Sequence, residues 1–126
     1  MRRTITIGTA LVGTVLAGIL APLTSAFAHA SLDHASPAVG STVHGSPAEV
    51  KVWFSEALDP ASTTLRVVDQ AGASVDQGDK AVDPVDRTLL KVSLRPLAPG
   101  KYKVLWRVRS VDSDTTVGSF TFSVAP

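Results

Sequence analysis

The chain has 126 residues, enough for one small domain with a modest core and too few for a large multidomain enzyme or a membrane channel. It contains no cysteine, so disulfide bonds, thiolate metal ligands and thiol nucleophiles are excluded. Its 12 Lys and Arg residues against 11 Asp and Glu residues give a formal net charge of +1, which offers no electrostatic reason to expect nucleic acid as a partner.

Residues 1–28 have the pattern of a secretory signal peptide. Met1-Arg2-Arg3 is a short cationic start, an apolar stretch follows, and Ala26-Phe27-Ala28 is a small-residue cleavage motif. A transmembrane anchor is the alternative, because residues 5–21 are nearly long enough to span a bilayer, but Thr and Gly residues dilute their hydrophobicity. We therefore expect an exported protein, periplasmic or extracellular, whose mature domain spans residues 29–126.

Cleavage after Ala28 would leave His29 as the first residue of the mature chain. The overlapping motif Ala28-His29-Ala30 offers a second cleavage position that would discard His29, but the first keeps the usual distance from the apolar stretch. An N-terminal histidine is chemically distinctive, because its α-amine and its imidazole Nδ1 can close a chelate ring on one metal ion. Two nitrogens joined by carboxylate oxygens suit Cu(II) best among the common divalent ions.

Beyond residue 29 the chain shows the period-two alternation of short β-strands and no convincing helical period. The alternation predicts strands over residues 49–54, 64–68, 88–94 and 102–109, and a last strand with Phe120, Phe122 and Val124 on one face. Residues 69–87 are the least regular part and should hold one weak strand and an exposed loop. Six or seven short strands separated by Pro and Gly predict an all-β fold, a small antiparallel Greek-key β-sandwich of immunoglobulin-like or cupredoxin-like type.

Several residues of the predicted strands have structural roles. Trp53 and Trp106 occupy strand positions and are expected to pack in the core or on a sheet face. Tyr102 follows a Pro-Gly turn, where it is either the tyrosine corner of a β-sandwich or a simple core residue. Four cations share the outward side of one strand, where they should form a solvated face that also protects the strand from unwanted pairing: Lys101, Lys103, Arg107 and Arg109.

Few residues remain that could carry chemistry. The three histidines, His29, His34 and His44, all lie near the mature N-terminus. Asp112 and Asp114 lie in the expected turn between the last two strands, where two carboxylates are either solvated turn formers or metal ligands. The chain has no nucleophile elbow, no glycine-rich phosphate loop and no H-E-x-x-H motif, so nothing in it predicts an enzyme.

Seven segments together resemble the CopC family of copper-resistance proteins, in the same order and over essentially the whole mature chain. They are residues 29–32 (HASL), 36–41 (SPAVGS), 52–56 (VWFSE), 100–102 (GKY), 106–108 (WRV), 110–112 (SVD) and 118–124 (GSFTFSV). The resemblance implies a periplasmic or secreted β-sandwich that binds Cu(II) for copper homeostasis and is often paired with a CopD-type membrane copper transporter. We expect the protein to be a monomer and, because the mature chain lacks methionine, to hold copper as Cu(II) in a single site.

The resemblance also implies the ligands. Family members bind Cu(II) through the N-terminal histidine, an aspartate and a second histidine two residues later, with a glutamate nearby. These roles fall on His29, Asp112 and Asp114, with Glu56 as the nearby carboxylate. Asp114 departs from the family pattern, because a carboxylate oxygen replaces an imidazole nitrogen, and this should lower the affinity for Cu(II).

Three outcomes are open at this position. The site could bind copper through two nitrogens and two oxygens, His34 or His44 could supply the missing nitrogen, or the site could be degenerate. A Cu(I) site of the methionine-rich kind found in some relatives is not expected, because Met1 is the only methionine.

Two other functions compete with a copper carrier. One is an immunoglobulin-like interaction module that has lost its metal, which the Asp114 replacement favours. The other is a histidine-brace copper oxidase of the polysaccharide monooxygenase type, which also begins with a histidine. The small domain leaves little room for a polysaccharide-binding surface, and no clear candidate exists for the second brace histidine.

Overall fold

The computed structural model describes residues 30–112 and 114–126. Within these residues it contains eight strands and one 3-10 turn, η2 (Pro60–Ser62). The strands are β1 (Leu32–Ser36), β2 (Thr42–His44), β3 (Glu49–Phe54), β4 (Thr64–Val68), β5 (Ala81–Val82), β6 (Leu89–Ser93), β7 (Gly100–Arg109) and β8 (Thr115–Ala125). Within this part of the chain, no helix has the length and apolar character needed to cross a membrane.

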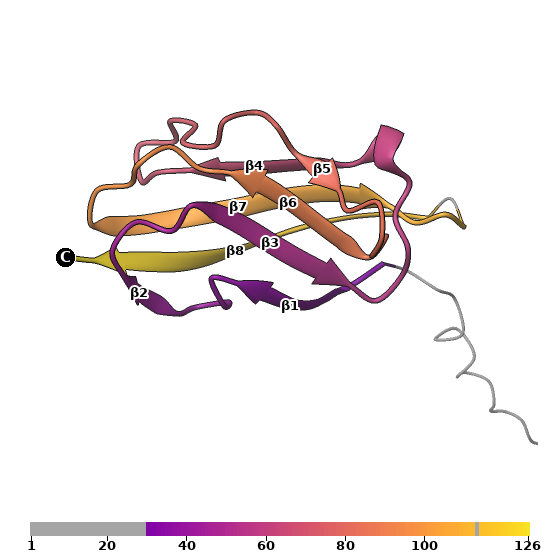
Figure 1. The fold of residues 1–126 in the computed structure, drawn as a ribbon, viewed down its shortest axis with the longest axis horizontal. Coiled ribbons are helices and arrows are strands. Elements are labelled where there is room, and N and C mark those ends of the chain that lie inside the picture. Colours follow the sequence, from indigo (N-terminus) through magenta and orange to yellow (C-terminus); the bar gives the residue numbers. More distant parts are fainter. Residues whose placement is uncertain (1–29, 113) are drawn as a thin grey trace, which may run out of the picture.

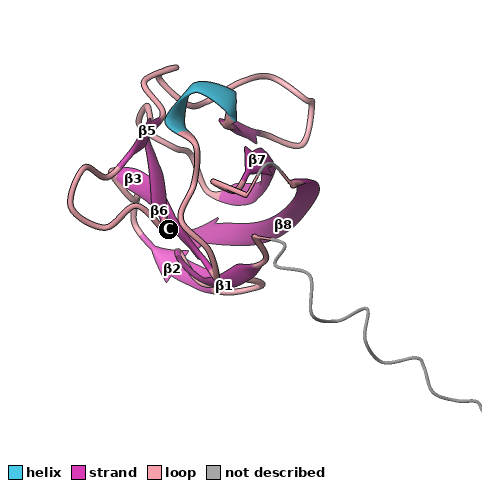
Figure 2. Ribbon diagram, turned by 90° about the vertical axis from the view of Figure 1, so that its right-hand side faces the viewer, coloured by secondary structure: helices cyan, strands magenta, loops and turns pink. Residues whose placement is uncertain are grey.

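The strands form two four-stranded sheets that pack face to face (Figures 1 and 2). One sheet has the order β1-β3-β6-β5 and the other the order β2-β8-β7-β4. This confirms the predicted Greek-key β-sandwich. One pairing differs from the predicted antiparallel pattern, since β2 runs parallel to β8. The chain changes sheets between β1 and β2, so no hairpin fixes the direction of β2 relative to its neighbour.

The alternation in the sequence places the core where it was expected. The inward residues of β3, β6 and β8 are buried, as predicted: Val50, Val52, Phe54, Leu90, Val92, Phe120, Phe122 and Val124. Trp106 is partly buried against this core, where its indole makes an edge contact with Phe54 and packs directly on Gly118 of the next strand. The indole of Trp106 can therefore occupy this position only because Gly118, opposite it, has no side chain.

The structure tests two predictions made for β7, the role of Tyr102 and the role of the outward cations. The Tyr102 hydroxyl donates a 2.6 Å hydrogen bond to the Ala98 carbonyl, so the residue is a tyrosine corner as well as a buried core residue. The cations of β7 do face outward, but β7 lies between β4 and β8. The predicted protection against unwanted pairing is therefore wrong, because a strand with neighbours on both sides has no free edge to protect.

The irregular segment between β4 and β6 is organised by a buried carboxylate. Asp76 is 4% exposed, and it accepts hydrogen bonds from the Val67 and Gly78 N–H groups and from the Ser74 hydroxyl. Burial opposes ionisation of this carboxyl group, but the three hydrogen bonds and the nearby Arg66 charge outweigh it, so the pKa of Asp76 lies below its ordinary value. An ionised side chain thus fixes the loop to the sheet.

Candidate metal centre

The described chain begins at one end of the sandwich and is held there by hydrogen bonds of Ala30 and Ser31. Ala30 is completely buried, and its carbonyl accepts a 2.7 Å bond from the Thr116 hydroxyl at the start of β8. The Ser31 N–H donates to the Ser55 Oγ at 3.0 Å, and the Ser55 N–H donates to the Ser31 carbonyl at 2.8 Å. The residues that follow position 29 are therefore fixed beside the ends of β3 and β8.

The turn between β7 and β8 reaches the same end of the sandwich. The Ser110 N–H donates to the Asp114 carbonyl at 2.9 Å, which closes the turn. The Val111 N–H donates to the Ala57 carbonyl at 3.0 Å, so the turn is joined to the segment directly after Glu56. The backbones that carry the three predicted carboxylates are thus neighbours.

The predicted ligands differ in their surroundings. Asp112 is exposed, whereas Asp114 and Glu56 are half-buried. His29 lies outside the described residues, so its position relative to the carboxylates stays a prediction. Within residues 30–112 and 114–126, no three His, Asp or Glu side chains lie close enough together to hold a metal ion. Carboxylates on neighbouring loops fit a divalent cation chemically, but nitrogen ligands would have to come from His29.

The two other histidines are placed differently. His44 pairs with Ala125, at the end of β8 opposite Thr115. An 11-residue strand spans about 35 Å, so His44 cannot replace the missing nitrogen ligand at Asp114. His34 is exposed, with its Nδ1 2.6 Å from an Asp33 carboxylate oxygen and its ring stacked on Trp53 at 4.3 Å. These contacts already engage its imidazole ring.

Sequence reasoning missed the residues that position this end of the sandwich. Thr116 and Ser55 anchor the first described residues, and only Ser55 lies in a segment that carried the family resemblance. Ser110 is 1% exposed, and its hydroxyl has no hydrogen-bond partner among the described residues. This buried hydroxyl lies two residues before Asp112 in the sequence.

These features define a class of protein: a sandwich of two sheets with acidic loops gathered at the end where the described chain begins. The model of the CopC domain matches residues 32–125. Protein YobA of Escherichia coli K12 is 33% identical over 101 residues, which covers 79% of this chain and 82% of YobA. Copper resistance protein C of Xanthomonas campestris pv. juglandis is 34% identical over 106 residues, covering 79% of this chain and 83% of the relative.

A solved structure agrees with these relatives. CopC from Methylosinus trichosporium OB3b superimposes with a TM-score of 0.73 at 32% identity, and the match covers 78% of this chain and 95% of that one. The chain belongs to the CopC family.

Proposed function

We propose that this protein is an exported carrier that binds one Cu(II) ion and delivers it to a partner, without bond-making chemistry of its own. The observation that carries the proposal is the gathering of Ala30, Glu56 and the Asp112–Asp114 turn at one end of a CopC-family sandwich. Removal of residues 1–28 as a signal peptide would expose His29 one residue before the anchored Ala30. A CopD-type membrane transporter is the proposed recipient, and the protein acts as a monomer.

The proposed ligands are the α-amine and Nδ1 of His29 and the carboxylates of Asp112 and Asp114, with Glu56 beside them. Two nitrogens and two oxygens make an equatorial set that Cu(II) accepts. The same set is poor for Cu(I), which prefers thioether and thiolate sulfur, and residues 30–126 contain no methionine or cysteine. The cargo is therefore the oxidised ion.

The first test is a Cu(II) titration of the chain that starts at His29. We expect one equivalent to bind, and we expect a control chain whose His29 α-amine is acetylated to bind roughly 100-fold more weakly, because an acetylated histidine has no free α-amine. Isothermal titration with a competing chelator measures the affinities, and EPR counts the nitrogens around Cu(II). Equal, weak binding by both chains would contradict the carrier function and support the interaction module.

Asp114→His tests the carboxylate that departs from the family pattern. The substitution exchanges an oxygen for an imidazole nitrogen, so we expect the Cu(II) affinity to rise by about tenfold or more. EPR should show one additional coordinated nitrogen. Asp79→His is the matched control, because it introduces the same imidazole at an exposed position beside Ser93, away from the Asp112–Asp114 turn. An equal gain in both variants would remove Asp114 from the ligand set.

A further inference from the structure

The outward side of β7 carries a row of cations, Lys101, Lys103, Arg107 and Arg109, which we call the basic face. The row extends over about 27 Å, since alternate residues of a strand are nearly 7 Å apart. None of the four cations forms an ion pair with another residue in the described ranges 30–112 and 114–126. The outward positions of the adjacent strands β4 and β8 carry no Asp or Glu.

This concentration of charge is not a consequence of a basic chain. Residues 30–126 contain ten Lys and Arg residues against eleven Asp and Glu residues. Without the four cations of the basic face, residues 30–126 contain six Lys and Arg residues against eleven Asp and Glu residues, so the remainder of the sandwich is acidic. Such a separation of charge creates a directional attraction for an anionic surface.

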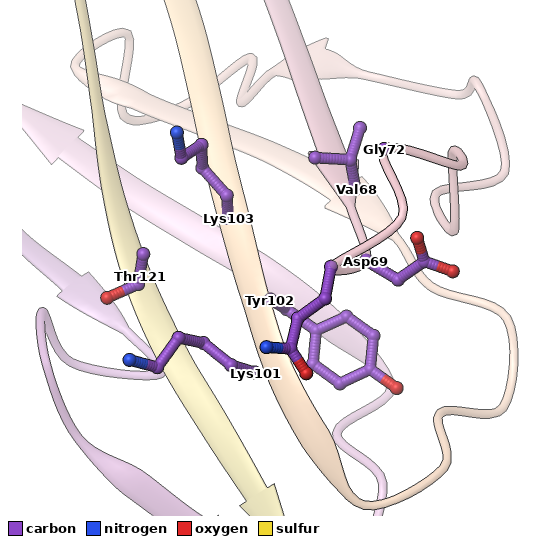
Figure 3. Close-up of a pocket in the computed structure, with 8 residues that line it drawn as sticks. Val68, Asp69, Gly72, Lys101, Tyr102, Lys103 and Thr121 are labelled. Atoms are coloured by element: carbon purple, nitrogen blue, oxygen red, sulfur yellow. The ribbon is translucent and has the colours of Figure 1, made fainter.

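Two apolar side chains lie among the cations. Leu105, on β7 itself, is 37% exposed, and Val117, which pairs with Arg107 from β8, is 67% exposed. At the other end of the face, a shallow hollow of about 250 Å³ lies beside Lys101 and Lys103, with Thr121 next to them (Figure 3). The Asp69 carboxylate at its rim accepts bonds from the Ala71 and Ala73 N–H groups.

The geometry of the sheet favours a flat partner over an added strand. The free side of β4 is covered by the following loop, because the Val75 N–H donates to the Val67 carbonyl and the Val67 N–H donates to Asp76. A peptide therefore cannot extend the sheet at the Val67 end of β4. An exposed face of cations with apolar side chains between them is complementary to anionic headgroups above a hydrocarbon layer.

We propose that the basic face docks this protein onto a membrane that contains anionic phospholipids. The cations attract the phosphate groups, the hollow beside Lys101 and Lys103 accommodates headgroup oxygens, and Leu105 and Val117 contact the boundary of the acyl chains. Docking does not require copper. Its test therefore gives the same answer whether or not the proposed carrier function is correct.

The test is flotation of the copper-free chain starting at His29 with vesicles of phosphatidylglycerol and phosphatidylcholine. The variant K101Q/K103Q/R107Q/R109Q removes the basic face. The matched control K51Q/K80Q/R87Q/R95Q removes four cations from other surfaces and has the same net charge. All eight positions are exposed or half-buried, and thermal melting verifies that each variant is folded.

We expect binding to the mixed vesicles at about 0.1 M salt, release at about 0.5 M salt, where the Debye length is roughly twofold shorter, and no binding to pure phosphatidylcholine. We expect the basic-face variant to bind roughly 600-fold more weakly, at about fivefold for each of its four cations, and the control variant to bind nearly as well as the natural chain. Equal losses in both variants, or equal binding to both vesicle types, would overturn the proposal. Binding to polyglutamate without binding to vesicles would instead assign the face to an acidic protein.

Discussion

Replacing Gly118 with alanine is expected to lower the free energy of unfolding by about 2–4 kcal/mol, because the new methyl group overlaps the Trp106 indole. A Cβ at position 118 would collide with Cζ2 of Trp106 and lie 2.7 Å from its Cη2. The indole cannot withdraw freely, since Phe54 lies 5.8 Å from it and Phe120 lies 6.3 Å from it between ring centres. Either the ring or the paired strands β7 and β8 must move.

Urea denaturation followed by tryptophan fluorescence measures this loss. Ser119→Ala is the control, because it changes an exposed neighbour on the same strand and should shift the stability by less than about 0.5 kcal/mol. In a Trp106→Phe background the smaller ring leaves space, so Gly118→Ala should cost clearly less than in the natural chain. A Gly118→Ala chain as stable as the natural one would show that the indole does not need this glycine.

Asp76→Asn should destabilise the domain by about 2–4 kcal/mol at neutral pH, although it changes only one atom of the side chain. Oδ1 of Asp76 accepts from the Val67 N–H and the Ser74 hydroxyl, and Oδ2 accepts from the Gly78 N–H at 3.0 Å. An asparagine can serve only one side, because its amide nitrogen would face another donor. The Gly78 N–H would lose its partner, and Arg66 would lose the nearby negative charge.

Asp79→Asn is the matched control, since Asp79 lies in the same loop and is exposed. Its Oδ1 accepts from the Ser93 N–H, and an asparagine oxygen can retain that bond. Urea denaturation at pH 7 should therefore separate the two variants clearly. Equal effects of the two substitutions would mean that burial of Asp76 adds nothing to the value of its hydrogen bonds.

The effect of Asp76→Asn should depend on pH in one direction. Because the pKa of Asp76 is lowered in the folded state, its ionised form contributes stability above the pKa of an unfolded aspartate, and this contribution is lost as the pH falls through the folded value. The difference between the natural chain and the variant should be constant from about pH 5 to 7 and should shrink below about pH 4. A difference that grows in acid would contradict this assignment.

The long strands could be predicted because their alternation reports burial directly. β3 was predicted with its exact bounds, and Val50 and Val52 are fully buried as expected. The weak strand expected within residues 69–87 is present as β5, although its bounds were not predicted. The strands β1 and β2 were not assigned, because they are short and because pairing with distant strands, rather than their own pattern, holds them in the sheets. The burial of Asp76 could not be predicted either, since nothing in the sequence separates a buried aspartate from the exposed ones around it.

The candidate site was predicted from family resemblance and only partly from chemistry. The structure places the Glu56 segment and the Asp112 turn side by side through the bond between Val111 and Ala57, which no spacing in the sequence could show. The anchoring of Ala30 by Thr116 joins residues 86 positions apart. Long-range hydrogen bonds of this kind depend on the completed sandwich, so they cannot be predicted from local sequence patterns.

The last described residue, Pro126, lies at the pole of the sandwich opposite Ala30 and the β7–β8 turn (Figure 1). A purification tag or a fluorophore attached after Pro126 would therefore be separated from the acidic loops by the length of β8. The same attachment would orient the molecule on a sensor chip with those loops facing the solution. An N-terminal tag would instead interfere with copper binding, because it would acylate the amine on which the proposed copper chelate depends.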